Sequence, residues 1–230
     1  MNDGTSTARD DTQGRAYRGG EEPRPLPEWF LLGLHAPTHL LSRLVWRIRL
    51  RGLEHIPAPE RGGLVIAANH QTYVDPFWVT IPVMRPLRHL AWSEQFKKPV
   101  LGKLLDLLGA WPLQIDRSDP RAYRRSLRWL RAGGALVIFP EGERSEADGL
   151  METFKAGAVR LALEAGVPVL PVTIRGGNRA WPRGQKWPRT GRVEIVYHPV
   201  QRLAPRPGED ARQCARRETE RLEAQIKSAL

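Results

Sequence analysis

Short apolar runs alternate with segments of helical periodicity between Leu64 and His198, and most of these runs are bounded by glycine, proline or charged residues. Short runs that are apolar throughout are typical of strands buried on both faces of a parallel sheet. They predict six strands, at Leu64–Ala68, Arg88–Trp92, Trp111–Ile115, Ala135–Phe139, Val169–Ile174 and Val193–Tyr197. The alternation therefore predicts an α/β domain with a mostly parallel central sheet and flanking helices.

Helices are expected between these strands, mostly where apolar residues recur at spacings of three and four. They are predicted at Pro76–Met84, Lys98–Leu108, Pro120–Ala132 and Phe154–Ala165. A further helix is expected within Glu209–Leu230, where four apolar residues fall near one helical face and charges alternate elsewhere. We expect this C-terminal helix to dock on the domain rather than to bind a partner.

The N-terminal residues have a different pattern. Residues 1–27 are polar and rich in glycine and charge, which predicts a disordered tail and not a secretory signal. Within residues 28–51, the stretch Trp29–Leu50 is apolar but contains Pro37 and three arginines, so we expect N-terminal amphipathic helices at 28–51 that lie on a membrane instead of crossing it. A helical hairpin that covers the core explains the same pattern equally well. The expected order is a tail at 1–27, this helical segment at 28–51, a main domain at 52–205 and a C-terminal helix within 206–230.

The charge balance indicates an anionic partner. The chain carries 36 Lys and Arg against 25 Asp and Glu, a formal net charge of +11, which attracts nucleic acid, an acidic lipid surface or phosphorylated substrates. The single cysteine, Cys214, excludes an intramolecular disulfide framework and a Cys-cluster metal site, and it suits a reducing compartment. No nucleic-acid motif is recognisable, so no nucleic acid is expected as a partner. A basic, non-catalytic nucleic-acid-binding module remains the alternative class.

Four clusters follow the ends of predicted strands, where ligand sites form in open α/β sheets. The first is NHQTYVDP at Asn69–Pro76, in which four residues separate His70 from Asp75. A histidine can take a proton from a hydroxyl, and a nearby carboxylate can fix its tautomer and steady the imidazolium that forms. Alternatively, Asp75 only N-caps a helix that begins at Pro76, and His70 is an ordinary loop histidine.

The other three clusters are weaker signals when each is taken alone. LQIDR ends in Arg117, whose planar guanidinium suits a phosphate. FPEGERS, at Phe139–Ser145, holds a second such residue, Arg144, close to backbone N–H groups freed by Gly142. VPVLPV, at Val167–Val172, is apolar, so it can shape a pocket but has no side chain that could take part in a reaction.

In this order, NHQTYVDP, LQIDR, FPEGERS and VPVLPV resemble the four motif blocks of the glycerolipid acyltransferase family, whose best-known members are the 1-acyl-sn-glycerol-3-phosphate acyltransferases. The resemblance covers roughly Leu64–Arg175 and implies a glycerol-3-phosphate acyltransferase-like fold, with 52–205 as the acyltransferase domain. It implies that His70 is the general base and Asp75 its partner. The substrate-binding residues that it implies are Arg117, Glu141, Gly142, Arg144 and Pro171.

The resemblance also implies transfer of a fatty acyl group from acyl-CoA or acyl carrier protein to the sn-2 hydroxyl of 1-acyl-sn-glycerol-3-phosphate. The partners would be a lysophospholipid acceptor, the acyl donor and an anionic membrane surface, and no metal or other cofactor is expected. The protein would be peripheral or monotopic on the cytoplasmic face of the membrane. Glu143 stands where the family usually has threonine, and a carboxylate there would repel a phosphate. A lyso-ornithine lipid, another lysophospholipid and a glycolipid are therefore alternative acceptors.

Overall fold

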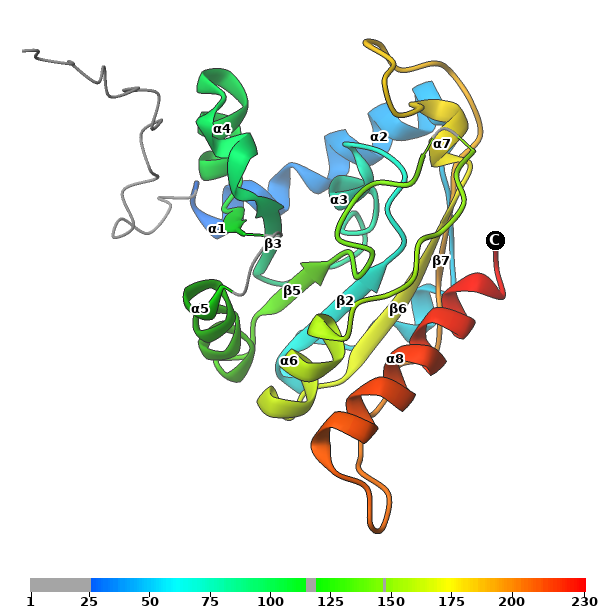
Figure 1. The fold of residues 1–230 in the computed structure, drawn as a ribbon. Coiled ribbons are helices and arrows are strands. Elements are labelled where there is room, and N and C mark those ends of the chain that lie inside the picture. Colours follow the sequence, from blue (N-terminus) through cyan, green and yellow to red (C-terminus); the bar gives the residue numbers. More distant parts are fainter. Residues whose placement is uncertain (1–25, 115–118, 147) are drawn as a thin grey trace, which may run out of the picture.

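The structure is a computed structural model that describes residues 26–114, 119–146 and 148–230 (Figure 1). Nearly all of the tail expected at 1–27 lies outside the described residues, and so does Arg117. Within the described residues, the chain folds as an α/β structure around one sheet.

Seven strands form this sheet within the described residues, in the order β1–β7–β6–β2–β5–β3–β4. All neighbouring pairs are parallel except β6 and β7, so the expected mostly parallel sheet is confirmed. The strands are β1 Arg49–Arg51, β2 Leu64–Ala68, β3 Leu87–Trp92, β4 Trp111–Leu113, β5 Ala135–Ile138, β6 Val169–Arg175 and β7 Glu194–Tyr197. Six match the predicted strands within two residues at each end. The pattern missed β1, because its sequence RLR contains no apolar run.

The helices are α1 Glu28–Gly33, α2 His35–Trp46, α3 Asp75–Trp78, α4 Pro99–Leu107, α5 Pro120–Arg131, α6 Gly157–Ala165, α7 Gly177–Ala180 and α8 Ala211–Lys227. The helix expected at Pro76–Met84 is wrong in extent, since α3 makes only one turn. Pro82 lacks a backbone N–H and disfavours the helical conformation at Ile81, so the chain continues in turns.

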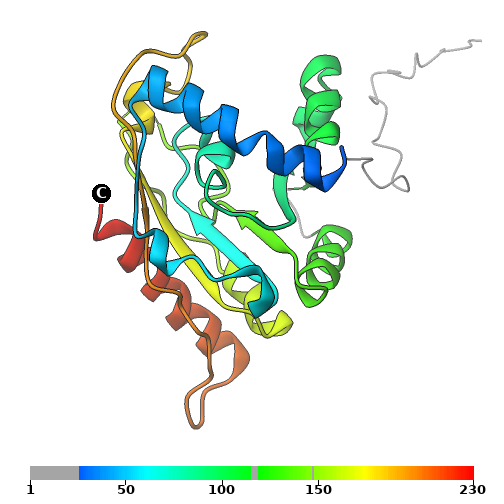
Figure 2. The same cartoon turned by 180° about the vertical axis from the view of Figure 1, so that it is seen from behind.

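The helical segment expected at 28–51 ends at Trp46, and residues 49–51 belong to the sheet as β1. The alternative prediction, a helical hairpin in which the two helices run antiparallel, is wrong. Leu34, between α1 and α2, keeps helical backbone angles of φ −71° and ψ −15°. The two helices therefore follow one another along one line (Figure 2).

One face of α2 covers the core and the other faces solvent. Ser42 and Trp46 are buried, and the Trp46 ring meets the edge of Trp78 with centroids 5.1 Å apart. The exposed face carries Leu40, Leu41 and Leu44. The helix thus combines both expected roles, a cover for the core and an apolar surface. Among the described helices, none is long and apolar enough to cross a membrane.

Both faces of the sheet are covered, and β2 shows how. Its alternate residues Leu64, Ile66 and Ala68 pack on the side of α2 and α3, while Val65 and Ala67 pack on the side of α5, α6 and α8. Figure 1 shows α6 and α8 crossing one face, and Figure 2 shows α2 across the other. All five residues are fully buried, as expected for a continuous apolar run.

Strands β2, β5 and β6 end at the same edge of the sheet, here called the carboxyl edge, where β7 and β1 begin. Helices α2, α3 and α7 lie along this edge (Figure 1). The loops that leave β2 and β5 therefore meet there, which brings the first and third sequence clusters together.

Candidate active site

The loop that leaves β2 folds around the carboxylate of Asp75, which is completely buried. Oδ2 accepts hydrogen bonds from the backbone N–H groups of Gln71, at 2.5 Å, and Thr72, at 2.7 Å. The Thr72 hydroxyl donates to Oδ1 at 2.6 Å, and His70 Nδ1 donates to Oδ2 at 2.9 Å. The N-cap of α3 is Val74, without a side-chain cap bond, so the interpretation of Asp75 as a mere helix cap is wrong. The carboxylate instead orients His70.

His70 is held by contacts from three directions. Besides the bond to Asp75, its ring stacks on Phe139 with centroids 4.0 Å apart and planes 20° apart. Its backbone N–H donates to Glu141 Oε1 at 2.5 Å, and its carbonyl accepts from the Ser145 N–H at 2.7 Å. Because Nδ1 donates to Asp75, Nε2 of the neutral ring carries a lone pair that can accept a proton. The side chain is 19% exposed, so a substrate hydroxyl can reach it.

Glu141 connects the two loops. Its carboxylate is buried, Oε1 accepts from the His70 N–H, and Oε2 accepts from the Glu152 N–H at 2.8 Å. Burial raises the pKa of this carboxyl to about 7, although both N–H donors favour the ionised form. Glu141 therefore positions the His70 backbone, and the structure gives it no direct contact with the His70 ring.

This raised pKa predicts a specific dependence of stability on pH. Between pH 4.5 and about 7, the Glu141 carboxyl binds a proton in the folded state more often than in the unfolded state. Its contribution to the free energy of unfolding is therefore fully present below this range and is lost as pH rises through it. Relative to Glu141→Gln, the wild type is expected to lose about 2–3 kcal/mol of unfolding free energy between pH 5 and pH 8, measured by urea denaturation. A difference that stays constant with pH would show that the carboxylate remains ionised throughout.

Gly142 and Arg144 shape the surface beside His70. Gly142 has φ +83°, a left-handed conformation that favours glycine, and an added Cβ would lie 2.7 Å from Lys155 Nζ. The Arg144 guanidinium lies over the exposed Tyr73 ring, with Cζ 3.6 Å from the centroid. Arg144 is half-buried, and this burial lowers the pKa of its guanidinium. No ion pair to Arg144 is found among the described residues, which leaves the guanidinium available to an anion.

Glu143 is mostly exposed and pairs with Arg183. Its side chain is 66% exposed, and its Oε2 lies 3.6 Å from Arg183 Nη2. Arg183 also pairs with Glu146 at 2.8 Å and donates to the Arg144 carbonyl at 3.0 Å. Arg183, which lies about 40 residues later in the chain, therefore holds the loop after β5 in place. No sequence pattern predicts this contact, because it depends on a distant loop folding back.

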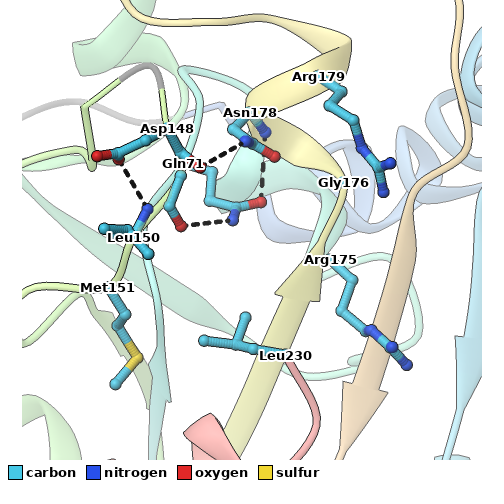
Figure 3. Close-up of a pocket in the computed structure, with 10 residues that line it drawn as sticks. Gln71, Asp148, Leu150, Met151, Arg175, Gly176, Asn178, Arg179 and Leu230 are labelled. Atoms are coloured by element: carbon cyan, nitrogen blue, oxygen red, sulfur yellow. Dashed lines mark hydrogen bonds between the residues drawn. The ribbon is translucent and has the colours of Figure 1, made fainter.

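Two side chains from the first cluster tie the loop after β2 to β6 and to the start of α7. The Asn69 amide donates to the Ile174 carbonyl and accepts from the Ile174 N–H, at 3.0 and 2.7 Å. Gln71 Oε1 accepts from the Gly177 N–H at 2.9 Å. Gln71 also lines a surface hollow of about 450 Å³ next to the site, together with Asn178 and Arg179 (Figure 3). These contacts fix the loop that carries His70.

The two remaining predicted residues do not join this cluster. Pro171 is buried within β6 opposite Ala67, three residues before His70, and its carbonyl accepts from the His198 N–H at 3.0 Å. Its role in lining a substrate cleft stays a prediction. Arg117 lies outside the described residues. In the described part of the chain, no group of three or more His, Cys, Asp or Glu side chains could hold a metal ion.

Comparison with known proteins gives one consistent result. The model of the Acyltransferase family matches residues 47–175. The chain is 34% identical over 167 residues to a 1-acyl-sn-glycerol-3-phosphate acyltransferase of Pseudomonas aeruginosa, covering 70% of this chain and 62% of that protein. It is 29% identical over 158 residues to a chloroplastic 1-acyl-sn-glycerol-3-phosphate acyltransferase of Arabidopsis thaliana, covering 66% of this chain and 43% of that protein. The match thus spans less than half of the plant relative.

A solved structure has the same fold. The crystal structure of the 1-acyl-sn-glycerophosphate acyltransferase PlsC from Thermotoga maritima superposes with a TM-score of 0.67 at 23% identity. The superposition covers 87% of this chain and 80% of that chain. The expected glycerol-3-phosphate acyltransferase-like fold is therefore confirmed.

Proposed function

The chain belongs to the Acyltransferase family, and on this premise we propose that it transfers a fatty acyl group to the sn-2 hydroxyl of 1-acyl-sn-glycerol-3-phosphate, forming phosphatidate. The donor would be a thioester, either acyl-CoA or acyl carrier protein. The observation that carries the proposal is the buried Asp75 carboxylate that holds His70 Nδ1 and leaves Nε2 as a base. The named activity of the relatives at about 30% identity supports the choice of acceptor.

In the proposed reaction, His70 Nε2 takes the proton of the acceptor hydroxyl while its oxygen attacks the thioester carbonyl carbon. A tetrahedral intermediate forms, the C–S bond breaks, and the imidazolium returns the proton to the leaving thiolate. Asp75 stabilises the imidazolium between the two proton transfers. No acyl-enzyme is needed, and Cys214 is poorly suited to form one, because it is buried in α8 and burial raises the pKa of its thiol.

The acceptor phosphate would bind beside His70, at Arg144. A half-buried guanidinium without an ion pair among the described residues suits a phosphate, which it can contact through two N–H groups. Glu143 is mostly exposed and its charge is paired with Arg183, which weakens the objection that its carboxylate would repel this phosphate. Lysophosphatidate is therefore the acceptor that we propose.

This assignment predicts a large effect on kcat/KM at Arg144 and a small one at the adjacent Glu143. Arg144→Gln is expected to lower kcat/KM for lysophosphatidate by about 10–100-fold, because it removes a charge-assisted contact. Glu143→Thr is the matched control and is expected to change kcat/KM by less than about threefold, since an exposed ion pair contributes little. Thiol release from acyl-CoA would be measured with lysophosphatidate, lysophosphatidylcholine and a lyso-ornithine lipid.

Two results would contradict the proposal, one from this assay and one from a salt titration of DNA binding. Faster turnover of a lysolipid without a phosphomonoester would give the reaction a different acceptor. Tight, salt-sensitive DNA binding without thiol release would favour the non-catalytic nucleic-acid-binding module.

We also propose that the protein works on a membrane surface, at the cytoplasmic face. Large apolar side chains are exposed on three helices, α1, α2 and α4, of which α2 lies along the carboxyl edge that carries His70 (Figure 1). They are Trp29, Phe30, Leu40, Leu41, Leu44, Val100, Leu104 and Leu107. A surface of this kind suits contact with the lipid that holds the acceptor.

A further inference from the structure

A second hollow, of about 280 Å³, lies at the carboxyl edge beyond the end of β6, where α2 and β1 meet the start of β7. Main-chain bonds join these segments: the Val193 N–H donates to the Trp46 carbonyl at 3.0 Å, and the Arg49 N–H donates to the Val193 carbonyl at 2.9 Å. Figure 2 shows the end of α2 beside the loop that precedes β7. Five arginines line this hollow, together with one valine and one glutamate, and we call it the arginine-lined hollow. The lining residues are Arg47, Arg49, Arg175, Arg179, Arg192, Val193 and Glu194.

The positive charge of this hollow is not balanced within the described residues. Glu194 pairs with Arg51 at 2.6 Å and with Arg175 at 3.0 Å, and no other carboxylate lines the hollow. The remaining lining arginines have no ion pair among the described residues: Arg47, Arg49, Arg179 and Arg192. Guanidinium groups gathered in this way repel one another, and a phosphate removes that repulsion while accepting their hydrogen bonds.

The backbone of Arg47 is strained where it enters the hollow. Arg47 is the C-cap of α2 and has φ 44° and ψ 42°, a left-handed conformation that glycine adopts more easily. Its neighbours Trp46 and Ile48 are buried, and they hold the chain in this turn. An arginine at a position that favours glycine indicates that its side chain, and not its backbone, is what the site requires.

The surroundings of the hollow favour a lipid over a dissolved phosphate compound. Leu44 and Leu40 precede Arg47 at helical spacings of three and seven and are exposed, Leu44 at 72%. The loop before β7 contacts the end of α2, because Trp46 Nε1 donates to the Arg189 carbonyl at 3.0 Å, and this loop carries Trp187, which is 73% exposed. Exposed leucine and tryptophan beside arginine are typical of a protein surface at the boundary between lipid headgroups and acyl chains.

We infer that the arginine-lined hollow binds the phosphate of an anionic phospholipid headgroup. This site is distinct from the proposed acceptor site at Arg144, and it would seat the carboxyl edge on the bilayer. The inference rests on the proposed membrane setting, and its test reads binding to lipid, which does not require acyl transfer.

The test compares binding to phosphatidylcholine vesicles with and without about 30% phosphatidylglycerol, by flotation at 0.15 M salt. Each basic residue near an anionic surface strengthens binding about fivefold, so Arg47→Gln/Arg192→Gln is expected to weaken binding to the anionic vesicles about 25-fold. The matched control is Arg124→Gln/Arg128→Gln, two exposed arginines on α5, which lies well away from α7 (Figure 1). It loses the same charge and is expected to weaken binding less than about twofold, because salt screens distant charges.

A single substitution separates binding from folding. Arg47→Gly relieves the left-handed strain, so it is expected to raise Tm by about 1–3 °C while weakening binding to the anionic vesicles about fivefold. A residue kept only for structure would leave vesicle binding unchanged.

Three outcomes would overturn the inference: an equal loss in both double variants, no loss in Arg47→Gln/Arg192→Gln, or a loss confined to the affinity for CoA measured without vesicles. The last would assign the hollow to the nucleotide phosphates of the donor. A wild type that binds anionic vesicles but releases no thiol would overturn the proposed function and leave this inference standing.

Discussion

His70→Ala is expected to lower kcat for thiol release from acyl-CoA by about 10²–10⁴-fold, with little change in KM. General-base assistance to a hydroxyl nucleophile contributes this much, and it acts in the transition state rather than in substrate binding. The structure supports the role because Asp75 holds Nδ1 at 2.9 Å and Phe139 stacks on the ring, so Nε2 is presented in one orientation.

A histidine outside the site provides the control for this variant. His55 lies in a 3-10 turn at Leu53–His55, and its Nδ1 bonds the Tyr197 carbonyl at 2.9 Å. His55→Gln is expected to stay within about twofold of the wild-type kcat, although it can lose some stability. Thermal unfolding of both variants would be followed by circular dichroism. If His70→Ala folds and keeps turnover within about threefold of wild type, another group must serve as the base.

The sequence predicted the parts of the site that depend on neighbours along the chain. His70 and Asp75 are close in sequence, and a strand that ends in a tight loop brings them together whatever the rest of the molecule does. The predicted limits of β2 match the structure to the residue. A strand buried on both faces is apolar throughout, so the first and last apolar residues mark its ends. The FPEG segment was placed beside His70 by the rule that parallel strands end at one edge.

Contacts between distant segments could not be predicted in this way. Arg183 reaches the loop after β5, and the Asn69 amide bonds Ile174 across 105 residues, through loop paths that no local pattern encodes. The orientation of Glu143 likewise depends on Arg183. The apolar pattern predicts too long a helix at α3, because apolar residues continue after Trp78 although Pro82 prevents the helix from continuing. Tertiary contacts therefore determine the polar contacts around the site, while local sequence patterns determine the arrangement of His70 and Asp75.

The carboxylate of Asp75 offers a separate test of how His70 is activated. Its Oδ2 accepts from three N–H donors, and its Oδ1 accepts from the Thr72 hydroxyl. In Asp75→Asn, the amide oxygen can take the Oδ2 position, and the amide nitrogen can donate to Thr72 Oγ1 once that hydroxyl rotates. The geometry of the loop can therefore survive, and what is lost is the negative charge beside the imidazolium.

Asp75→Asn is expected to lower kcat by about 10²–10⁴-fold, because a neutral amide cannot stabilise the imidazolium as a carboxylate does. The loss of charge-assisted bonds in a fully buried site is expected to reduce the free energy of unfolding by about 2–3 kcal/mol, measured in urea at pH 7. Glu220→Gln, an exposed carboxylate on α8, is the control and should change neither quantity measurably. A variant that unfolds as predicted yet retains wild-type kcat would limit Asp75 to a structural role, and His70 would then act without a carboxylate partner.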